Sequence, residues 1–143
     1  MKINEMFEIE YPIFQGGMAN IATGDFAAAV SNAGAMGIIG AGGMRAADLR
    51  EHIRRCKELT DRPFGVNIML MNPDADEMAE IVAEEQVLLV TTGAGNPGKY
   101  MTKWKEAGVR VFPVVSSVAL ARRLEASGAD GVIAEGCESG GHI

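Results

Sequence analysis

The sequence predicts an α/β fold of the TIM-barrel type, a (β/α)8 barrel of which this chain supplies about six βα units. Short apolar runs recur along the chain, amphipathic segments separate them, and glycines gather directly after the runs. The runs are residues 11–14, 36–40, 64–70, 87–92, 109–115 and 131–135. Their length of four to seven residues and their lack of strict alternation are typical of strands buried on both faces, as in a parallel sheet.

The segments between these runs predict one helix for each crossover. Met78, Ile81 and Val82 share one helical face, and Leu120 and Leu124 share another. Three segments end in a small residue followed by glycine, as helix C-terminal caps do: Ala33-Gly34, Ala107-Gly108 and Ser127-Gly128. No linker interrupts the pattern. We therefore expect residues 1–143 to be the N-terminal portion of a single barrel whose remainder is absent, because about six strands do not close an eight-stranded barrel.

The positions of the glycines favour a barrel over an open doubly wound sheet, since both folds alternate strands and helices. Glycine pairs or clusters follow four of the predicted strands, at residues 16–17, 40–43, 93–95 and 140–141. A barrel gathers the loops after all of its strands around one site, whereas an open sheet uses chiefly the loops at its switch point. The expected site therefore lies at the rim formed by the carboxyl ends of the strands.

Composition and charge exclude several classes of protein. The net charge of −6 argues against a nucleic-acid binder, because phosphate binding normally requires a basic surface. No apolar stretch approaches the roughly 20 residues of a membrane helix, and the first ten residues contain no signal-peptide core. We expect a cytoplasmic protein that binds neither nucleic acid nor membrane.

The two cysteines predict neither a disulfide nor a metal site. Cys56 and Cys137 lie far apart and lack CxxC or CxxH spacing, so no metal ligand set is expected. Cys56 shares a helical stripe with Leu49 and Ile53, which predicts a core position. Cys137 follows the last predicted strand, but no histidine or acid is arranged to activate it as a nucleophile.

The predicted helix around residues 45–57 is the most basic part of the chain. It carries Arg45, Arg50, Arg54, Arg55 and Lys57. A solvated helix face is the expected interpretation, and docking of an acidic partner is the alternative. The histidine within this helix, at position 52, is expected on the surface.

His142 is the strongest candidate for catalysis. It follows the predicted strand at 131–135 and the pair Gly140-Gly141. An imidazole titrates near neutral pH, so a histidine at the carboxyl end of a parallel strand is suited to proton transfer. A structural role in the loop is the alternative.

Three further features are candidates for ligand binding at the same rim. The Gly16-Gly17 turn would bring backbone amides close to a flat ligand, with the polarizable thioether of Met18 beside it, and a simple strand-turn is the alternative. Asn67 interrupts an apolar run and needs partners, either a ligand edge or neighbouring backbone. Glu135 ends the last predicted strand, where a cofactor N–H or hydroxyl, or a neighbouring amide, would satisfy its carboxylate.

Residues 93–98 form an apparent dinucleotide-binding fingerprint, GAGNPG, after the predicted strand at 87–92. A Rossmann site would require an acid at the end of the next strand, but residues 109–115 are followed by Ser116-Ser117. The sequence instead favours a tight βα turn with Pro97 near the first helical position, or a rim loop that touches a ligand.

Together, four segments resemble the flavin-dependent enoyl-acyl carrier protein reductases of bacterial type II fatty-acid synthesis, which belong to the nitronate monooxygenase-like FMN barrels. The segments are YPIFQGGMA at 11–19, FGVNIML at 64–70, TTGAGNP at 91–97 and AEGCESGGHI at 134–143. The resemblance spans the chain in order and spacing. Cys137 departs from it, since relatives are expected to have methionine or a similar residue there.

The resemblance implies an FMN-binding barrel. Gly17 and Met18 would line the isoalloxazine ring, while Asn67 and Glu135 would bond the ring system or the ribityl chain. The pair at 140–141 would let the last loop pack closely, so the implied FMN-binding residues are Gly17, Met18, Asn67, Glu135, Gly140 and Gly141.

The resemblance also implies a reaction and its partners. The enzyme would take a hydride from NADH or NADPH and deliver it to an enoyl thioester carried on acyl carrier protein, with His142 as the catalytic residue. A homodimer is expected. Two alternatives remain: a nitronate monooxygenase that uses the same flavin, and an inactive half-barrel fragment.

Overall fold

The computed structural model of the chain describes residues 1–141, and it contains a five-stranded parallel sheet. The strands are β1 (Gly37–Gly40), β2 (Phe64–Met69), β3 (Leu89–Gly93), β4 (Arg110–Val115) and β5 (Ile133–Ala134). They lie in the order β1-β2-β3-β4-β5, so the sheet grows in one direction as the chain proceeds. A doubly wound sheet would reverse its strand order at a switch point. The order confirms the predicted α/β fold as an incomplete TIM-type barrel.

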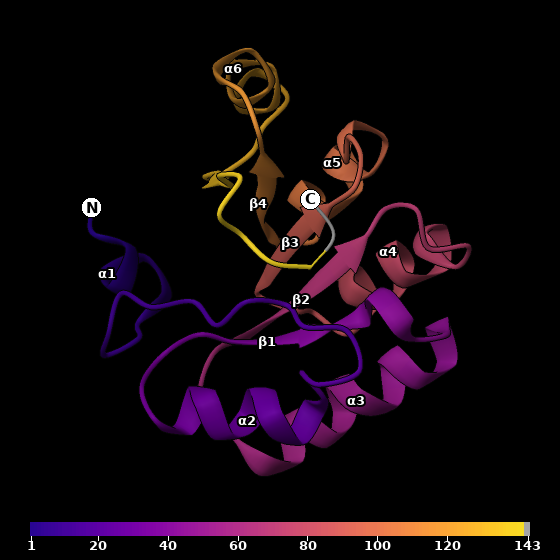
Figure 1. Cartoon of the computed structure of the whole chain (residues 1–143). Helices are drawn as coiled ribbons and strands as arrows, with labels where there is room; N and C mark the ends of the chain where they lie inside the picture. Colours follow the sequence, from indigo (N-terminus) through magenta and orange to yellow (C-terminus); the bar gives the residue numbers. More distant parts are fainter. Residues whose placement is uncertain (142–143) are drawn as a thin grey trace.

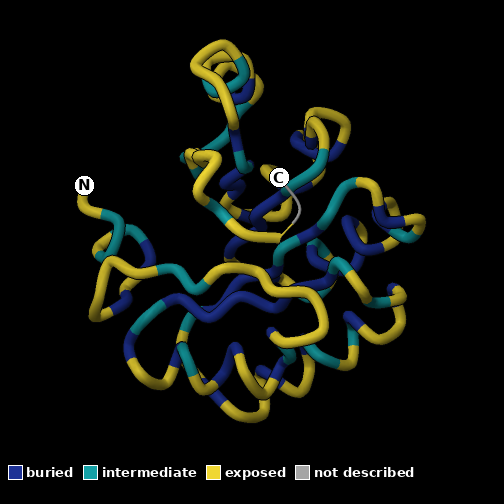
Figure 2. Tube along the Cα trace, viewed as in Figure 1, coloured by how far each residue is buried: buried dark blue, intermediate teal, exposed yellow. Residues whose placement is uncertain are grey.

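Helices connect successive strands and form an arc on the outer side of the sheet (Figure 1). They are α2 (Gly24–Asn32), α3 (Ala46–Leu59), α4 (Ala75–Glu84), α5 (Gly98–Glu106) and α6 (Val118–Ala126), with a 3-10 turn η1 (Ala41–Gly43) after β1. The strands are mostly buried, and the loop through residues 16–21 is exposed (Figure 2). The short helix α1 (Ile3–Phe7) precedes this arc.

Two apolar clusters lie on opposite faces of the sheet. The outer one joins the sheet to the helices and includes Val66, Val90 and Trp104. The inner one lies on the concave face, where Phe7 of α1 contacts Phe112 of β4, with ring centroids 5.5 Å apart. This inner cluster also contains Ile38 and Leu89, which lie near the amino ends of β1 and β3. It therefore fills the end of the concave face opposite the predicted rim.

The first predicted strand, residues 11–14, does not form as a strand. Phe14 makes a single parallel bridge to Met36. Pro12 has no N–H to donate, and the next contact with β1 comes from the side chain of Gln15. The prediction of about six strands is corrected accordingly: within residues 1–141 five strands form, and residues 11–15 lie along β1 through a bridge and a side chain.

The last predicted strand is shorter than expected, because β5 contains two residues. Within residues 1–141, β5 pairs with β4 and with no other strand. Apolar side chains are exposed beside it and on residues 11–14 at the other side of the sheet, with Val132 at 40% and Ile13 at 57% exposure. The sheet is therefore open on both sides, as the incomplete strand count predicts.

The predicted helix C-terminal caps are confirmed. Gly34, Gly108 and Gly128 have φ angles of 103°, 77° and 110°, directly after α2, α5 and α6. This left-handed conformation strains residues with a Cβ atom, which explains why glycine occupies all three positions.

The helix α3 differs from its prediction at two points. His52 is half-buried, and its Nδ1 accepts a hydrogen bond of 3.0 Å from the backbone N–H of Gly24 at the start of α2. The basic face is also not simply solvated, since Arg50 and Arg54 pair with Glu85 at the end of α4. Both corrections have one cause: periodicity places a residue on a helix face but does not identify the neighbouring helix.

The cysteines occupy different environments. Cys56 is fully buried, and burial, followed by the nearby charge of Asp25, raises the pKa of its thiol to about 12. Cys137 is exposed. The core prediction for Cys56 is confirmed.

Candidate functional site

The loop at residues 16–18 crosses the carboxyl end of β1 and reaches β2. A Cβ atom on Gly17 would lie 2.5 Å from the Cβ of Asn67, and one on Gly40 would lie 2.7 Å from the carbonyl oxygen of Met18. Neither position can hold a larger residue without movement of the loop. Gly17 is therefore placed beside Asn67, and Met18 beside Gly40, the register partner of Asn67, at the rim that the sequence predicts, although both follow a bridge and not a strand.

Gln15 anchors the start of this loop, a role that the sequence analysis missed. Its Oε1 accepts a hydrogen bond of 2.9 Å from the N–H of Ile38, and its Nε2 donates one of 3.1 Å to the carbonyl oxygen of the same residue. The side-chain amide thus replaces a backbone rung beside β1. No periodicity signals such a replacement, because it depends on where the chain leaves the sheet.

Asn67 lies on the concave face, directly opposite Thr91 of β3 in the strand register. The Thr91 hydroxyl donates a hydrogen bond of 2.8 Å to Asn67 Oδ1. Asn67 is half-buried, and no acceptor for its Nδ2 is present among residues 1–141. The predicted need for a partner is therefore met on the oxygen side of the amide by a neighbouring side chain, while the N–H groups stay free for a ligand.

The turn between β3 and α5 has the form of a tight βα turn. Ala94 and Gly95 have φ angles of 56° and 150°, and Asn96 Oδ1 accepts a hydrogen bond of 2.8 Å from the N–H of Gly98. Pro97 directly precedes the first helical residue, close to the predicted position. The turn lies against β2, since a Cβ atom on Gly95 would be 3.2 Å from the Cβ of Leu70.

Two polar residues after β2 hold the neighbouring rim loop, and sequence reasoning missed both. The Nδ2 of Asn72 donates to the carbonyl oxygens of Gly42 and Met44, at 3.2 and 3.1 Å. Asp74 accepts a hydrogen bond of 3.0 Å from the N–H of Ala46 at the start of α3, and the adjacent Arg45 guanidinium is the main cause that lowers the pKa of its carboxyl group. A run of polar residues around a proline directly after a strand is the signal that could have indicated them.

Glu135 extends the contact between β5 and β4 and is half-buried. Its backbone N–H donates a hydrogen bond of 3.0 Å to the carbonyl oxygen of Val115. It therefore follows the carboxyl end of β5 at the rim, as predicted. Nearby, the Oγ of Ser139 is buried and has no partner among the described residues, a feature that the sequence analysis did not identify.

Gly140 and Gly141 are exposed, and a Cβ atom on either would meet no described atom within 4 Å. The close packing expected at this pair is therefore not formed among the described residues. Gly141 instead has a φ angle of 86°, which itself favours glycine. His142, the predicted catalytic residue, lies outside the described residues.

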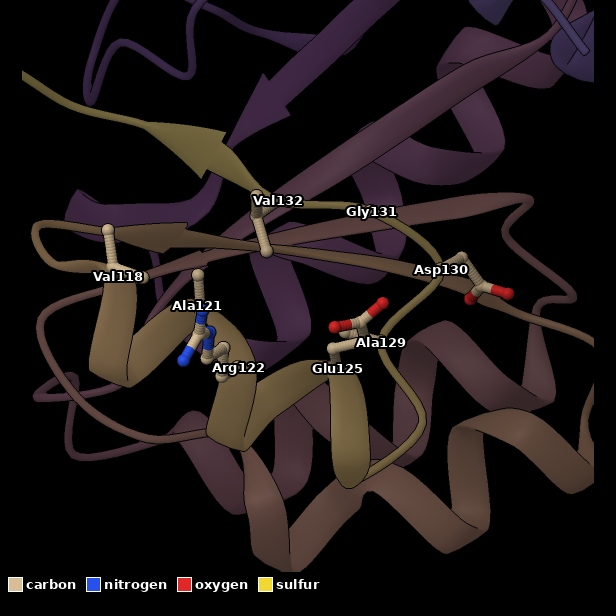
Figure 3. Close-up of a pocket in the computed structure, with 8 residues that line it drawn as sticks. All are labelled: Val118, Ala121, Arg122, Glu125, Ala129, Asp130, Gly131 and Val132. Carbon is tan, nitrogen blue, oxygen red and sulfur yellow. The ribbon is translucent and has the colours of Figure 1, made fainter.

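A cavity of about 300 Å³ lies away from these residues (Figure 3). It is bounded by α6 and by the chain that leads into β5, with Val118, Ala121 and Arg122 on one side and Asp130 and Val132 on the other. None of the predicted site residues lines it. The cavity belongs to the open side of the sheet and not to the rim.

Residues 1–141 show neither a metal-binding cluster nor a membrane-spanning helix. Residues 1–141 contain no group of three or more His, Cys, Asp or Glu side chains that could hold a metal ion. Among the helices of that part of the chain, none is both long enough and apolar enough to cross a membrane.

The rim as described fits a planar, polar ligand such as a flavin. Among the described residues, no heavy atom lies within 4 Å of the place where a Cβ atom on Gly16 or Gly93 would be. Asn67 presents N–H donors on the concave face that have no acceptor among residues 1–141, and the apolar cluster around Phe7 closes the opposite end. A flat ring could therefore lie against glycine backbone with a hydrogen-bond donor at its edge.

Comparison with known families agrees with this geometry. The family model described as nitronate monooxygenase matches residues 1–87 and 76–143. The chain belongs to the nitronate monooxygenase family. Members of this family are FMN-dependent oxidoreductases.

Among curated relatives, a 5-hydroxy-7a-methyl-1-oxo-octahydro-1H-indene-4-carboxyl-CoA dehydrogenase of Mycobacterium tuberculosis is 35% identical, over 98% of this chain and 39% of that protein. A nitronate monooxygenase of Paraburkholderia phytofirmans is 30% identical, over 94% of this chain and 47% of that protein. The chain thus spans less than half the length of these relatives.

Two solved structures share the fold. FabK of Thermotoga maritima has a TM-score of 0.96 and 55% identity, over 99% of this chain and 45% of that one. A nitroalkane oxidase of Streptomyces ansochromogenes has a TM-score of 0.88 and 27% identity, over 100% of this chain and 50% of that one. Both likenesses support the assignment of the curved sheet to an incomplete barrel.

Proposed function

We propose that this chain belongs to an FMN-dependent enzyme that reduces trans-2-enoyl thioesters on acyl carrier protein, with NADH or NADPH as reductant. The observation that carries the proposal is the 55% identity with FabK, an enoyl-acyl carrier protein reductase, over 99% of the chain. Identity with the nitroalkane oxidase is about half as high, at 27%. The relative that is a carboxyl-CoA dehydrogenase also favours a thioester substrate.

The rim residues would serve this reaction by binding and orientation. Bound FMN supplies hydride transfer between the nicotinamide and the enoyl thioester. The Gly17 turn would contact the flat ring through its backbone, because no side chain fits between it and Asn67. Asn67 would donate hydrogen bonds from Nδ2, its Oδ1 being engaged by Thr91. Glu135 and Met18 would complete the contacts around the ring, and Gly140-Gly141 would shape the last loop.

His142 would act on the substrate and not on the reductant. Addition of a hydride at the β-carbon leaves an enolate, whose single negative charge is shared between the thioester oxygen and the α-carbon. An imidazole on the loop after β5 could stabilise the oxygen and hold the proton that the α-carbon receives. In this proposal, Cys137 takes no part.

The substitution His142→Ala tests this role in the protein expressed from its complete coding sequence. We expect flavin reduction by NAD(P)H to change little and enoyl reduction to slow by about 100-fold or more, the scale of a positioned acid. Stopped-flow measurement of the two half-reactions separates them. Equal loss in both would contradict the assignment and indicate a structural histidine.

Nitronate monooxygenase is the second candidate, because the family model and the 30% identical relative carry that name. Anaerobic mixing with NADH and then with a crotonyl thioester distinguishes the two activities. Rapid flavin bleaching by NADH, followed by reoxidation with the thioester, supports the reductase. Oxidation of a nitroalkane without NADH, together with no reoxidation of the flavin by the thioester, would reject the reductase assignment.

The remaining expectations belong to the same proposal. We propose a cytoplasmic homodimer that receives its substrate on acyl carrier protein. Analytical ultracentrifugation of the holoenzyme tests the dimer. An inactive half-barrel is the competing interpretation, and a yellow protein with stoichiometric flavin absorbance would count against it.

A further inference from the structure

Two adjacent threonines near the end of β3 are both almost fully buried but have opposite surroundings. Thr91 is 2% exposed and Thr92 is 1% exposed. Thr91 stands opposite Asn67, two residues after Leu89 of the inner cluster, so it faces the concave side. Thr92 stands opposite Ile68 of the outer cluster and faces the helices.

Their hydroxyl groups differ in the same way. The Thr91 hydroxyl donates to Asn67 Oδ1 at 2.8 Å. The Thr92 Oγ has no partner among residues 1–141. The chain therefore offers a partnered hydroxyl and an unpartnered one at neighbouring positions of one strand.

The bond from Thr91 engages the oxygen end of the Asn67 amide and leaves the nitrogen end available at the rim. With Oδ1 held by β3, the N–H donors of Nδ2 lie on the other side, where Nδ2 is 3.0 Å from the place of a Cβ atom on Gly17. Without that bond, rotation about the last torsion of the side chain could present either oxygen or nitrogen, since an amide is nearly symmetric in shape.

We propose that Thr91 is a positioning residue that fixes the Asn67 amide with its N–H donors toward the rim, so that the site selects a ligand edge with hydrogen-bond acceptors. This inference rests on the proposed FMN site. The carbonyl oxygens and unprotonated ring nitrogens of a flavin are such acceptors, whereas its N3–H edge is a donor. A donor also favours the more negatively charged, reduced ring, because hydrogen bonds to charged acceptors are stronger.

The experiment compares Thr91→Val with Thr92→Val in the protein expressed from its complete coding sequence. FMN affinity is measured by titration of the apoprotein with fluorescence detection, and the midpoint potential of bound FMN by spectroelectrochemistry. For Thr91→Val we expect about tenfold weaker FMN binding, the scale of one hydrogen bond to a ligand, and a more negative potential. Thr92→Val should leave both unchanged and should not lower the melting temperature of the apoprotein.

Two further variants separate positioning from packing. Thr91→Ser keeps the hydroxyl and should restore FMN affinity and potential, even where the lost methyl group lowers the melting temperature. In an Asn67→Ala background, Thr91→Val should have no further effect on FMN affinity, because its action passes through the amide. If Thr91→Val folds poorly, Thr91→Ala must show the same loss of affinity.

The outcomes distinguish this inference from the proposed function. Wild-type protein that binds no FMN rejects the proposed function and this inference with it. Wild-type protein that binds FMN, together with a Thr91→Val variant of equal affinity and potential, rejects the inference alone. Additive effects of Thr91→Val and Asn67→Ala would also overturn it.

Discussion

Glycine at position 17 lets the loop after residues 11–14 lie directly on Asn67. The adjacent Gly16 has no such neighbour among the described atoms, although both are exposed. From sequence, the two glycines of the pair are equivalent, and Gly17 is preferred because of the resemblance to flavin enzymes. The structure adds the physical reason, since a methyl group at 17 would overlap the Asn67 side chain.

The substitution Gly17→Ala should therefore weaken FMN binding, because the loop must move away from β2 or displace the Asn67 amide. We expect a loss of affinity of about tenfold or more, equivalent to roughly 1.4 kcal/mol. Gly16→Ala is the matched control and should bind FMN like the wild type. Fluorescence titration of both apoproteins checks this, and equal affinities for the two variants would contradict the steric argument.

Gln15 shows how one side chain can replace an element of structure. Its amide bonds both backbone groups of Ile38, so residues 11–15 stay beside β1 without forming a strand. Gln15→Leu should lower the free energy of unfolding by about 1–3 kcal/mol, because the polar groups of Ile38 would lose their partners. Urea unfolding measures this loss, and Gln15→Glu, which keeps the acceptor for the Ile38 N–H, should lose less. A leucine variant as stable as wild type would show that water replaces the amide.

At the scale of elements, α3 and α4 are joined by an ion cluster around Glu85. Its side chain is 11% exposed and pairs with Arg50 and Arg54 at 2.8 and 3.0 Å. Partial burial raises the pKa of Glu85, but the hydrogen bonds from both guanidinium groups outweigh that effect, so the pKa lies below its ordinary value. A folded-state pKa below the unfolded one means that the ionised carboxylate stabilises the fold.

Because the pKa of Glu85 is lowered on folding, its contribution to stability depends on pH. The contribution of Glu85 is fully present above the unfolded-state pKa of about 4.3 and is lost as pH falls through the lower folded-state pKa. Glu85→Gln should therefore cost about 1–3 kcal/mol of unfolding free energy at pH 7 and progressively less at more acidic pH.

The neighbouring Glu84 is the control for this prediction. It is 57% exposed and pairs with Arg50 alone among the described residues, so Glu84→Gln should cost less than about 1 kcal/mol at any pH. Urea unfolding of each variant between pH 7 and pH 3 provides the comparison. Equal losses for the two substitutions at neutral pH would mean that the partial burial of Glu85 does not strengthen its ion pairs.

At the scale of the whole molecule, the sheet has two open sides. Ile13 and Tyr11 are exposed beside β1, and Val132 and Val118 are exposed beside β5 and α6, where the cavity in Figure 3 lies. Unpaired strand edges with apolar neighbours favour association with other chains.

A polypeptide of residues 1–143 alone should therefore self-associate or aggregate, and it should bind FMN poorly, since phosphate contacts in such barrels commonly come from loops after strands 7 and 8. Gel filtration with light scattering tests the association. Replacement of Ile13 and Val132 by lysine should reduce it, because charged edges resist pairing. A monodisperse monomer of 15.1 kDa that carries stoichiometric FMN would refute both expectations.

Much of the fold could be predicted because its causes are local. Buried parallel strands appear as short apolar runs. Helix ends appear as glycines, because the left-handed φ angles at Gly34, Gly108 and Gly128 would strain other residues. Asn67 could also be selected from sequence, since an amide within an apolar strand needs a partner. The resemblance that names His142 as catalytic depends on sequence in the same way and stays a prediction.

The tertiary structure alone decided which side chains meet. The contacts of Thr91 with Asn67 and of Gln15 with Ile38 join residues 24 and 23 positions apart, and no local pattern encodes them. The same holds for His52, which periodicity placed on a solvated face and which instead accepts a hydrogen bond from Gly24 of another helix. Local propensity determined where strands and helices form, whereas the register and curvature of the sheet determined which polar groups lie together at its rim.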